Sequence, residues 1–289
     1  MIDDLKTKIL QAIKNHRENY KSDAQHARVL GINTAQYSRI NNGEFEKVIS
    51  EPKWITLARL LNVQLKDTAT WLTVETETFN YITDQLEACQ NRSLSAIFCD
   101  RAGIGKTHAG QDYANRNKNA VYIDCSQVKS KQKLIRQIAR EFGVEYNGRY
   151  ADIYEDLVFY IKTIPNPLII LDEAGDLNYD AFLELKALWN ATPYCCGWYM
   201  MGADGLKQKI NRQYNLKKVG FAEILDRFGN DYKRVSPEGK DAVKEFDLQQ
   251  VALISKANKS ILPPLKMYAK TLGSLRKVRT EIEKQQLLG

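Results

Sequence analysis

Residues 100–107, which read Asp-Arg-Ala-Gly-Ile-Gly-Lys-Thr, decide the fold of this chain. They follow an apolar run over residues 94–99 and precede a helical stretch. The pattern G-x-x-x-x-G-K-[ST] between a strand and a helix forms a loop whose amides hold phosphate groups, with Lys at the terminal phosphates and Ser or Thr at Mg²⁺. Asp100 replaces the first Gly, but Asp tolerates unusual backbone angles, so we expect a working loop. Its expected ligand-binding residues are Ala102, Gly103, Ile104, Gly105, Lys106, Thr107 and His108.

A second stretch, Leu168-Ile-Ile-Leu-Asp-Glu173, supports this interpretation. It is an apolar strand that ends in two carboxylates, an arrangement in which Asp supports Mg²⁺ and Glu polarises the attacking water. A chance Gly-x-Gly-Lys-Thr in a surface turn is the alternative for the loop, but it does not explain this second stretch. We therefore predict binding and hydrolysis of ATP, with Thr107 and Asp172 at Mg²⁺ and Glu173 as a catalytic carboxylate.

The sequence on both sides of these motifs alternates apolar runs with helical periodicity, which is typical of a parallel sheet covered by helices. The expected strands are 94–99, 120–125, 168–171, 197–201 and 231–235. The expected helices are 107–117, 130–142, 153–163, 179–190 and 221–227. In such an α/β fold the ligand lies at the carboxyl ends of the strands. From Ser236 onward only helical patterns remain, interrupted at Pro263-Pro264, which predicts a small helical lid.

The first seventy residues have a different, all-helical pattern. Residues 22–43 predict a short helix that stops at Gly31 and a second helix capped by Asn33 or Thr34. The side chains expected to face inward are Ala27, Leu30, Tyr37 and Ile40. This spacing is that of a helix-turn-helix and resembles the lambda-repressor class, although a helical hairpin used only for packing is the alternative. The outward candidates for DNA contact are Thr34, Gln36, Ser38 and Arg39.

A threonine-rich stretch with few basic residues, 68–83, separates the two patterns. We predict four segments, which are a helix-turn-helix domain over 1–70, a linker over 71–90, a nucleotide-binding core over 91–235 and a helical lid over 236–289. No run approaches the roughly eighteen apolar residues of a membrane span, and the first residues lack the pattern of a signal peptide. We therefore expect a cytoplasmic protein without a membrane partner.

The net charge of +7 permits a polyanionic partner without requiring one. Five scattered cysteines and three histidines favour neither a disulfide framework nor a zinc site. Two stretches without acidic residues, 126–140 and 206–220, each follow a core strand. In an assembly of subunits both can track a DNA backbone, although a solvated helix face is the alternative. The candidate contacts are Lys129, Lys131, Lys133, Lys207, Lys209 and Arg212.

Three further motifs, in this order along the chain, resemble those of AAA+ ATPases. Ala203-Asp204 resembles the sensor 1 position, at which a polar side chain orients water. Residues 221–228 read Phe-Ala-Glu-Ile-Leu-Asp-Arg-Phe and resemble the end of a helix that presents an arginine finger to the neighbouring subunit. Arg227 is the first candidate for this finger and Arg212 the second. Gly273-Ser-Leu-Arg276 resembles sensor 2, whose lid arginine reaches the γ-phosphate. An Arg that only complements a helix dipole is the alternative for such positions. A finger from a neighbour implies that activity requires assembly.

The chain resembles the phage Mu B transposition proteins over nearly its whole length. The resemblance rests on the order of its parts, which are the N-terminal domain, the phosphate-binding loop, Leu-Asp-Glu, Met-Gly-x-Asp, Leu-x-Arg-Phe and Gly-Ser-Leu-Arg. This resemblance implies an ATP-dependent protein that binds double-stranded DNA with little sequence specificity and polymerises on it as a filament. It also implies that the protein selects target DNA and activates a transposase, and that hydrolysis clears it from DNA. Asp100 and Asp204 depart from the pattern, which bears on the rate of hydrolysis more than on binding.

Two other functions share these motifs. A helicase loader or replication initiator has the same AAA+ core but loads a ring onto DNA. An ATP-regulated transcription factor reads an operator through its N-terminal domain, and the modest basic charge of residues 34–41 argues mildly against it. Sequence-indifferent coating of DNA that requires ATP distinguishes the transposition protein from the regulator.

Overall fold

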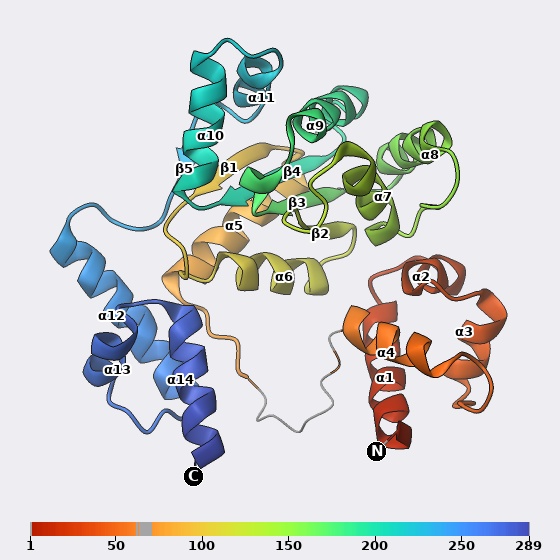
Figure 1. Ribbon diagram of the computed structural model, residues 1–289, viewed down its shortest axis with the longest axis horizontal. Helices are drawn as coiled ribbons and strands as arrows, with labels where there is room; N and C mark the ends of the chain where they lie inside the picture. The colour runs from red at the N-terminus through yellow and green to blue at the C-terminus, as the bar shows by residue number, and fades with distance from the viewer. Residues whose placement is uncertain (1, 62, 64–70, 289) are drawn as a thin grey trace.

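The centre of the computed structural model, which describes residues 2–61, 63 and 71–288, is a five-stranded parallel sheet (Figure 1). The strand order is β2-β3-β4-β1-β5, and every neighbouring pair is parallel. The strands are β1 (Ser95–Cys99), β2 (Ala120–Asp124), β3 (Leu168–Asp172), β4 (Gly197–Gly202) and β5 (Tyr232–Lys233). β1, β2 and β5 lie within the predicted runs, and β3 and β4 each extend one residue beyond theirs. Their carboxyl ends therefore share one edge of the sheet, where the loop after β1 and the acids after β3 meet.

Helices cover both faces of the sheet (Figure 1). One face carries α5 (Glu77–Arg92) and α6 (Lys106–Arg116). The other side holds α7 (Lys131–Glu141), α8 (Tyr150–Thr163), α9 (Tyr179–Ala191), α10 (Asp204–Asn215) and α11 (Phe221–Arg227), with the short 3-10 helix η1 (Ala174–Asp176) after β3. Among the described residues, no helix has the length and apolarity needed to cross a bilayer.

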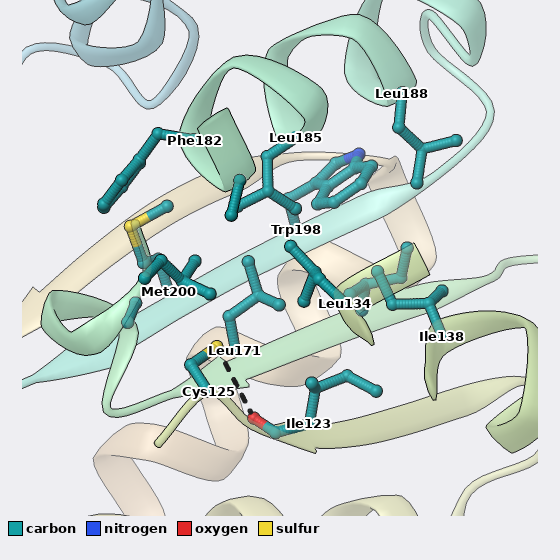
Figure 2. Close-up of a cluster of buried hydrophobic side chains, with 14 of the residues drawn as sticks. Ile123, Cys125, Leu134, Ile138, Leu171, Phe182, Leu185, Leu188, Trp198 and Met200 are labelled. Atoms are coloured by element: carbon teal, nitrogen blue, oxygen red, sulfur yellow. Dashed lines mark hydrogen bonds between the residues drawn. The ribbon is translucent and has the colours of Figure 1, made fainter. Parts of the chain in front are cut away.

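Two apolar cores lie on the two faces because side chains alternate along each strand. In β4, Trp198 and Met200 belong to the core under α9, whereas Tyr199 and Met201 belong to the core under α5 and α6. Figure 2 shows part of the larger core, in which side chains of β2, β3 and β4 meet those of α7 and α9. Strands buried on both faces appear in a sequence as continuous apolar runs, which explains why these strands were predictable.

The N-terminal helices α1 (Ile2–Arg17), α2 (Asp23–Leu30), α3 (Thr34–Asn41) and α4 (Glu51–Leu60) surround a separate core. Helix α2 ends at Gly31, whose φ of +64° suits a residue without Cβ. Asn33 caps α3, because its side chain accepts a hydrogen bond of 2.8 Å from the Gln36 amide. The four side chains predicted to face inward are all buried. The predicted helix pair and its turn are therefore confirmed.

The lid consists of α12 (Lys240–Ala257), α13 (Pro264–Thr271) and α14 (Leu275–Leu288), which share a small core of their own. Helix α13 begins at Pro264, so the Pro-Pro pair separates two helices as predicted. The structure differs from the prediction of a linker over 71–90. Trp71 and Val74 pack against the lid core, and α5 buries Phe79 and Ile82 under the sheet. The threonine-rich composition obscured these apolar residues and their helical spacing.

Candidate nucleotide-binding site

The loop between β1 and α6 has the backbone of a phosphate-binding site. Gly103 and Gly105 have φ angles of +80° and +105°, which side chains with a Cβ rarely adopt, so the backbone requires glycine at both positions. Helix α6 starts directly after them, and its free amides and dipole favour an anion. The Lys106 ammonium donates to the carbonyl oxygens of Asp100 (2.7 Å) and Arg101 (2.6 Å). Burial lowers the pKa of Lys106, and neighbouring carboxylates offset part of this effect.

The carboxylates that end β3 lie against this loop. The Thr107 hydroxyl donates to Asp172 Oδ2 at 2.6 Å, and the Tyr122 hydroxyl donates to the same oxygen at 2.7 Å. Hydroxyl and carboxylate oxygens are the hard ligands that Mg²⁺ prefers, so Thr107 and Asp172 fit this ion. Asp172 is only 1% exposed, and its hydrogen bond with Thr107 holds the two side chains together.

Glu173, the next residue, is held in an unusual position. Its φ of +49° is in the left-handed region, which costs a residue with a side chain about 1–2 kcal/mol. Burial and the neighbouring Asp172 carboxylate raise the pKa of Glu173. A carboxylate with a raised pKa is a better proton acceptor near neutral pH. The raised pKa of Glu173 therefore suits a group that polarises water.

One cavity of about 280 Å³ joins the loop, the segment before α5 and the lid. Its apolar lining comes mainly from the last two parts, with Trp71, Leu72, Val74, Phe79, Ile254 and Leu275. Its polar lining includes Lys106, Thr107, Glu173 and Arg276, and the Arg279 guanidinium lies 5.2 Å from the centre of the Trp71 ring. Apolar walls with a few converging polar groups are typical of a small-molecule site, and this combination suits a base with phosphates.

Most predicted nucleotide residues meet in this cavity. Its lining includes Ala102, Gly103, Gly105, Lys106, Thr107, His108, Glu173 and Arg276. The Ile104 side chain belongs instead to the core under α5 and α6, being 2% exposed. Asp204 is exposed in the first turn of α10, and the preceding Ala203 lines the cavity in its place. The role of Asp204 at sensor 1 thus stays a prediction.

The two arginine-finger candidates lie outside the lining of this cavity. The Arg227 guanidinium donates to Asn190 Oδ1 at 3.0 and 2.6 Å and lies 5.0 Å from the centre of the Trp189 ring. Arg212 is exposed on α10. A finger acts on a neighbouring subunit, so these positions agree with the expectation without testing it.

The wall formed by residues 71–76 was missed by sequence reasoning, which assigned it to a linker. Asn258 at the end of α12 fixes this wall, since its side chain bonds both the amide (2.9 Å) and the carbonyl (3.1 Å) of Leu72. Thr73 Oγ1 lies 3.0 Å from His108 Nε2, which links the wall to α6. The available signal was the apolar residues Trp71, Leu72 and Val74 within a polar stretch.

The side chains of α3 that were predicted to contact DNA differ in their exposure and in the hydrogen bonds they already make. Thr34, Ser38 and Arg39 are exposed, and Arg39 pairs with Glu44 at 2.8 Å. Gln36 is committed to the fold, because its Oε1 accepts from the Asn33 amide (3.2 Å) and its Nε2 donates to Val48 (3.3 Å). The helix cap thus uses the side chain that was expected to reach bases.

The two basic stretches meet around η1. Lys209 donates to the carbonyl oxygens of Gly175 (2.7 Å) and Leu177 (2.6 Å), so its ammonium stabilises the turn after β3. Lys129 pairs with Asp176 of η1 at 3.0 Å. The exposed members of the candidate set are Lys129, Lys131, Lys133, Lys207 and Arg212. The fold therefore brings two stretches far apart in sequence together beside η1, at the carboxyl end of β3.

Comparison with known proteins agrees with this geometry. Residues 89–210, from the end of α5 into α10, match a family described as the AAA domain. The Mu-like prophage FluMu DNA transposition protein B of Haemophilus influenzae is 26% identical over 186 residues, which cover 62% of this chain and 64% of that protein. The ATP-dependent target DNA activator B of Escherichia phage D108 is 24% identical over 285 residues, covering 95% of this chain and 85% of that protein.

A solved structure, the Aeropyrum pernix ORC1 protein in complex with DNA, resembles the chain with a TM-score of 0.53 and 16% identity, covering 74% of this chain and 60% of that one. At this identity the likeness concerns the fold alone. Together with the AAA match and the parallel sheet, it confirms the predicted fold class. The chain spans just under two thirds of the length of the Haemophilus influenzae relative.

Proposed function

We propose that the chain is an AAA+ ATPase of DNA transposition, of the Mu B type, and that it binds double-stranded target DNA in its ATP-bound state. The observation that carries this proposal is one cavity that combines Lys106 and Thr107 of the loop with Glu173 after β3 and Arg276 of the lid. The names of the two relatives, a transposition protein B and an ATP-dependent target DNA activator B, support the role in transposition.

Each polar group of the cavity has a role in this proposal. Lys106 and the amides that start α6 bind the phosphates, and Arg276 contacts the terminal one from the lid. Thr107 and Asp172 hold Mg²⁺, which neutralises phosphate charge when bound. Glu173 orients a water molecule and accepts its proton. The apolar wall at Trp71 contacts the base.

Assembly completes the proposed mechanism. Subunits associate on DNA, and Arg227 of one subunit, or Arg212 as the second candidate, acts on ATP bound to the next. The exposed lysines of the two basic stretches contact phosphates without reading sequence. The assembled protein presents target DNA to a transposase, and hydrolysis weakens the subunit interface and releases DNA.

Substitution of the loop lysine tests the coupling of ATP to DNA binding. Lys106→Ala is expected to abolish ATP binding and the ATP-dependent gain in DNA affinity, measured by nucleotide titration and by footprinting on two unrelated DNA sequences. Lys118→Ala, an exposed lysine just beyond the other end of α6, is the matched control and is expected to behave as wild type. Unchanged DNA affinity in Lys106→Ala contradicts the proposal. A short operator protected without ATP supports a transcription factor instead, and stimulated loading of a helicase ring supports a loader.

A further inference from the structure

Asp100, the first residue of the phosphate-binding loop, makes contacts that phosphate binding does not require. It is 2% exposed, and its Oδ2 accepts hydrogen bonds from the amides of Val235 (2.9 Å) and Ser236 (2.8 Å). Its Oδ1 accepts from the Arg101 amide at 2.7 Å. Burial by itself raises the pKa of this carboxyl, but the hydrogen bonds from Ser236, Arg101 and Val235 hold it below its ordinary value. An anion at the start of the loop thus fixes the chain between β5 and the lid.

Arg101, the second residue of the loop, reaches into the lid itself. Its two terminal nitrogens donate to the two carboxylate oxygens of Asp247 in α12 at 2.9 and 2.7 Å, and its Nε donates to the Ser236 hydroxyl at 3.2 Å. A two-point bond between guanidinium and carboxylate is strong and fixes orientation. Asp247 is 2% exposed, and a carboxylate so buried depends on its cationic partner.

A third contact joins the middle of the loop to the start of α14. The Gly103 carbonyl accepts a hydrogen bond of 2.8 Å from the Leu275 amide. A Cβ on Gly103 would lie 2.7 Å from the Ser274 hydroxyl, so the lid approaches the loop as closely as glycine allows. Residues 100, 101 and 103 all bond to the lid or to the segment that leads into it.

The phosphate-contacting lysine bonds to the same part of the loop. Lys106 donates to the carbonyl oxygens of Asp100 and Arg101, whose side chains hold α12 and the hinge, which is the segment of Val235 and Ser236 between β5 and the lid. A nucleotide that draws the ammonium towards its phosphates takes donors away from these two carbonyls. A change at the phosphates therefore acts on the two residues that carry the lid.

We propose that Asp100 and Arg101 are positioning residues that latch the helical lid to the phosphate-binding loop, so that nucleotide binding at the loop sets the position of the lid. This role explains why Asp replaces the first Gly of the pattern, since glycine has no side chain to hold the hinge amides. The proposal goes beyond nucleotide binding but rests on it, because the ligand that moves the loop is the one in the proposed function.

The first experiment needs no nucleotide and tests the latch alone. Asp100→Gly restores the usual loop pattern, and Asp100→Asn keeps the shape of the side chain with one acceptor oxygen. Amide hydrogen exchange at Val235 and Ser236 is expected to accelerate about tenfold or more in Asp100→Gly and less in Asp100→Asn. Glu281→Gln, which removes a charge from pairs that lie within the lid, is the control and is expected to leave both amides protected. Unchanged exchange in Asp100→Gly overturns the latch.

The second experiment tests whether the latch transmits nucleotide binding. Arg101→Gln, Asp247→Asn and the double variant are titrated with a non-hydrolysable ATP analogue and Mg²⁺, while exchange of α12 and α14 is followed. Each single variant is expected to weaken binding about tenfold, and the double variant no further, because the two residues act as one unit. The analogue is expected to slow lid exchange in wild type but not in the variants. The double variant keeps an uncharged pair capable of hydrogen bonding, which guards against misfolding of the lid.

Additive losses in the double variant, or a full lid response in Arg101→Gln, overturn the proposal. Failure of the wild type to bind the analogue contradicts the proposed function instead. The exchange of Val235 and Ser236 without nucleotide still decides whether the latch exists, so the two failures are distinguishable.

Discussion

The lid and the N-terminal domain are both attached to the sheet core, but by different chemistry at different places. The lid is attached to the phosphate-binding loop through the buried carboxylates of Asp100 and Asp247 and the partly exposed guanidinium of Arg101. The N-terminal domain donates hydrogen bonds to uncharged acceptors of the core; the Gln25 amide, for example, donates to the Phe142 carbonyl (2.7 Å) and to the Tyr160 hydroxyl. The first attachment lies at the phosphate-binding loop, and the second lies at the C-cap of α7 and in the last turn of α8.

Distance separates the two attachments as well. Asn19 donates to the Asn115 carbonyl at 2.9 Å, near the carboxyl end of α6, whereas Lys106 starts this helix. At 1.5 Å per residue, these two positions of α6 are roughly 14 Å apart along its axis. Arg28 donates to the Gly143 carbonyl at 3.2 Å, again away from the loop. The contacts of the lid therefore lie on the phosphate-binding loop, whereas those of the N-terminal domain lie away from it.

The largest expected effect falls on a surface that belongs to neither attachment. Arg227→Ala is expected to lower ATP hydrolysis about 10³-fold, the lower end for an arginine finger, while nucleotide affinity stays at the wild-type value. Arg227 lies outside the lining of the nucleotide cavity of its own subunit, so its loss leaves the loop and the lid of that subunit intact. Steady-state hydrolysis with DNA and nucleotide titration measure the two effects. Normal hydrolysis in Arg227→Ala removes this assignment and directs attention to Arg212.

Acid is expected to weaken the N-terminal domain selectively. His26 is fully buried between Tyr37 (2.8 Å) and His16 (3.1 Å), and burial, reinforced by His16, lowers its pKa to about 3. Below about pH 6.5 the unfolded chain binds a proton at this histidine and the folded chain does not. The free energy of unfolding therefore falls by about 1.4 kcal/mol for each unit by which the pH is lowered from 6.5 towards 3. The loss is about 2 kcal/mol at pH 5.

Burial lowers the pKa of His16 as well and acts in the same direction. The segment 236–289 contains no histidine, so the lid does not share this source of acid sensitivity. Hydrogen exchange of α2 and α12 at pH 7 and pH 5, corrected for intrinsic rates, measures both parts in one sample. His26→Gln is expected to reduce the dependence of the stability of α2 on pH. Equal destabilisation of the two parts by acid contradicts the distinction.

A smaller effect is expected when the lid attachment is strained by one methyl group. A Cβ on Gly273 would lie 2.5 Å from Asp247 Oδ2, so Gly273→Ala displaces the carboxylate that Arg101 holds. We expect nucleotide affinity to fall about tenfold, equivalent to 1.4 kcal/mol. Gly229→Ala is the matched control, because Gly229 has a similar φ of +82° but its added Cβ would meet no described residue within 4 Å. Equal affinities in the two variants show that backbone strain, and not the lid contact, determines the result.

The sheet, the loop and the helix pair were predictable because each is encoded locally. Continuous apolar runs mark strands buried on both faces, and a cap such as Asn33 marks a helix start. The apolar residues of the wall at Trp71 were visible in the sequence, but the contact of this wall with the lid and the contacts of Asp100 were not predictable, since both involve residues more than 100 positions away. Asp100 appeared as a weakness of the loop because its partners, the amides of Val235 and Ser236, have no signature in sequence.

The smallest effect on nucleotide binding is expected at the other attachment, and it completes the comparison. A Cβ on Gly143 would lie 2.5 Å from Gln25 Cγ and 3.1 Å from the Gln25 carbonyl, so Gly143→Ala forces α2 away from the end of α7. Exchange of α2 and of the end of α7 is expected to accelerate, while nucleotide affinity stays within about twofold of wild type, because the loop and the lid are untouched. Gly148→Ala is the control, because Gly148 has a φ of +114° and its added Cβ would have no atom of the described chain within 4 Å. A loss of nucleotide affinity in Gly143→Ala as large as that in Gly273→Ala means that the N-terminal domain is coupled to the loop after all, and that the two attachments differ in chemistry but not in consequence.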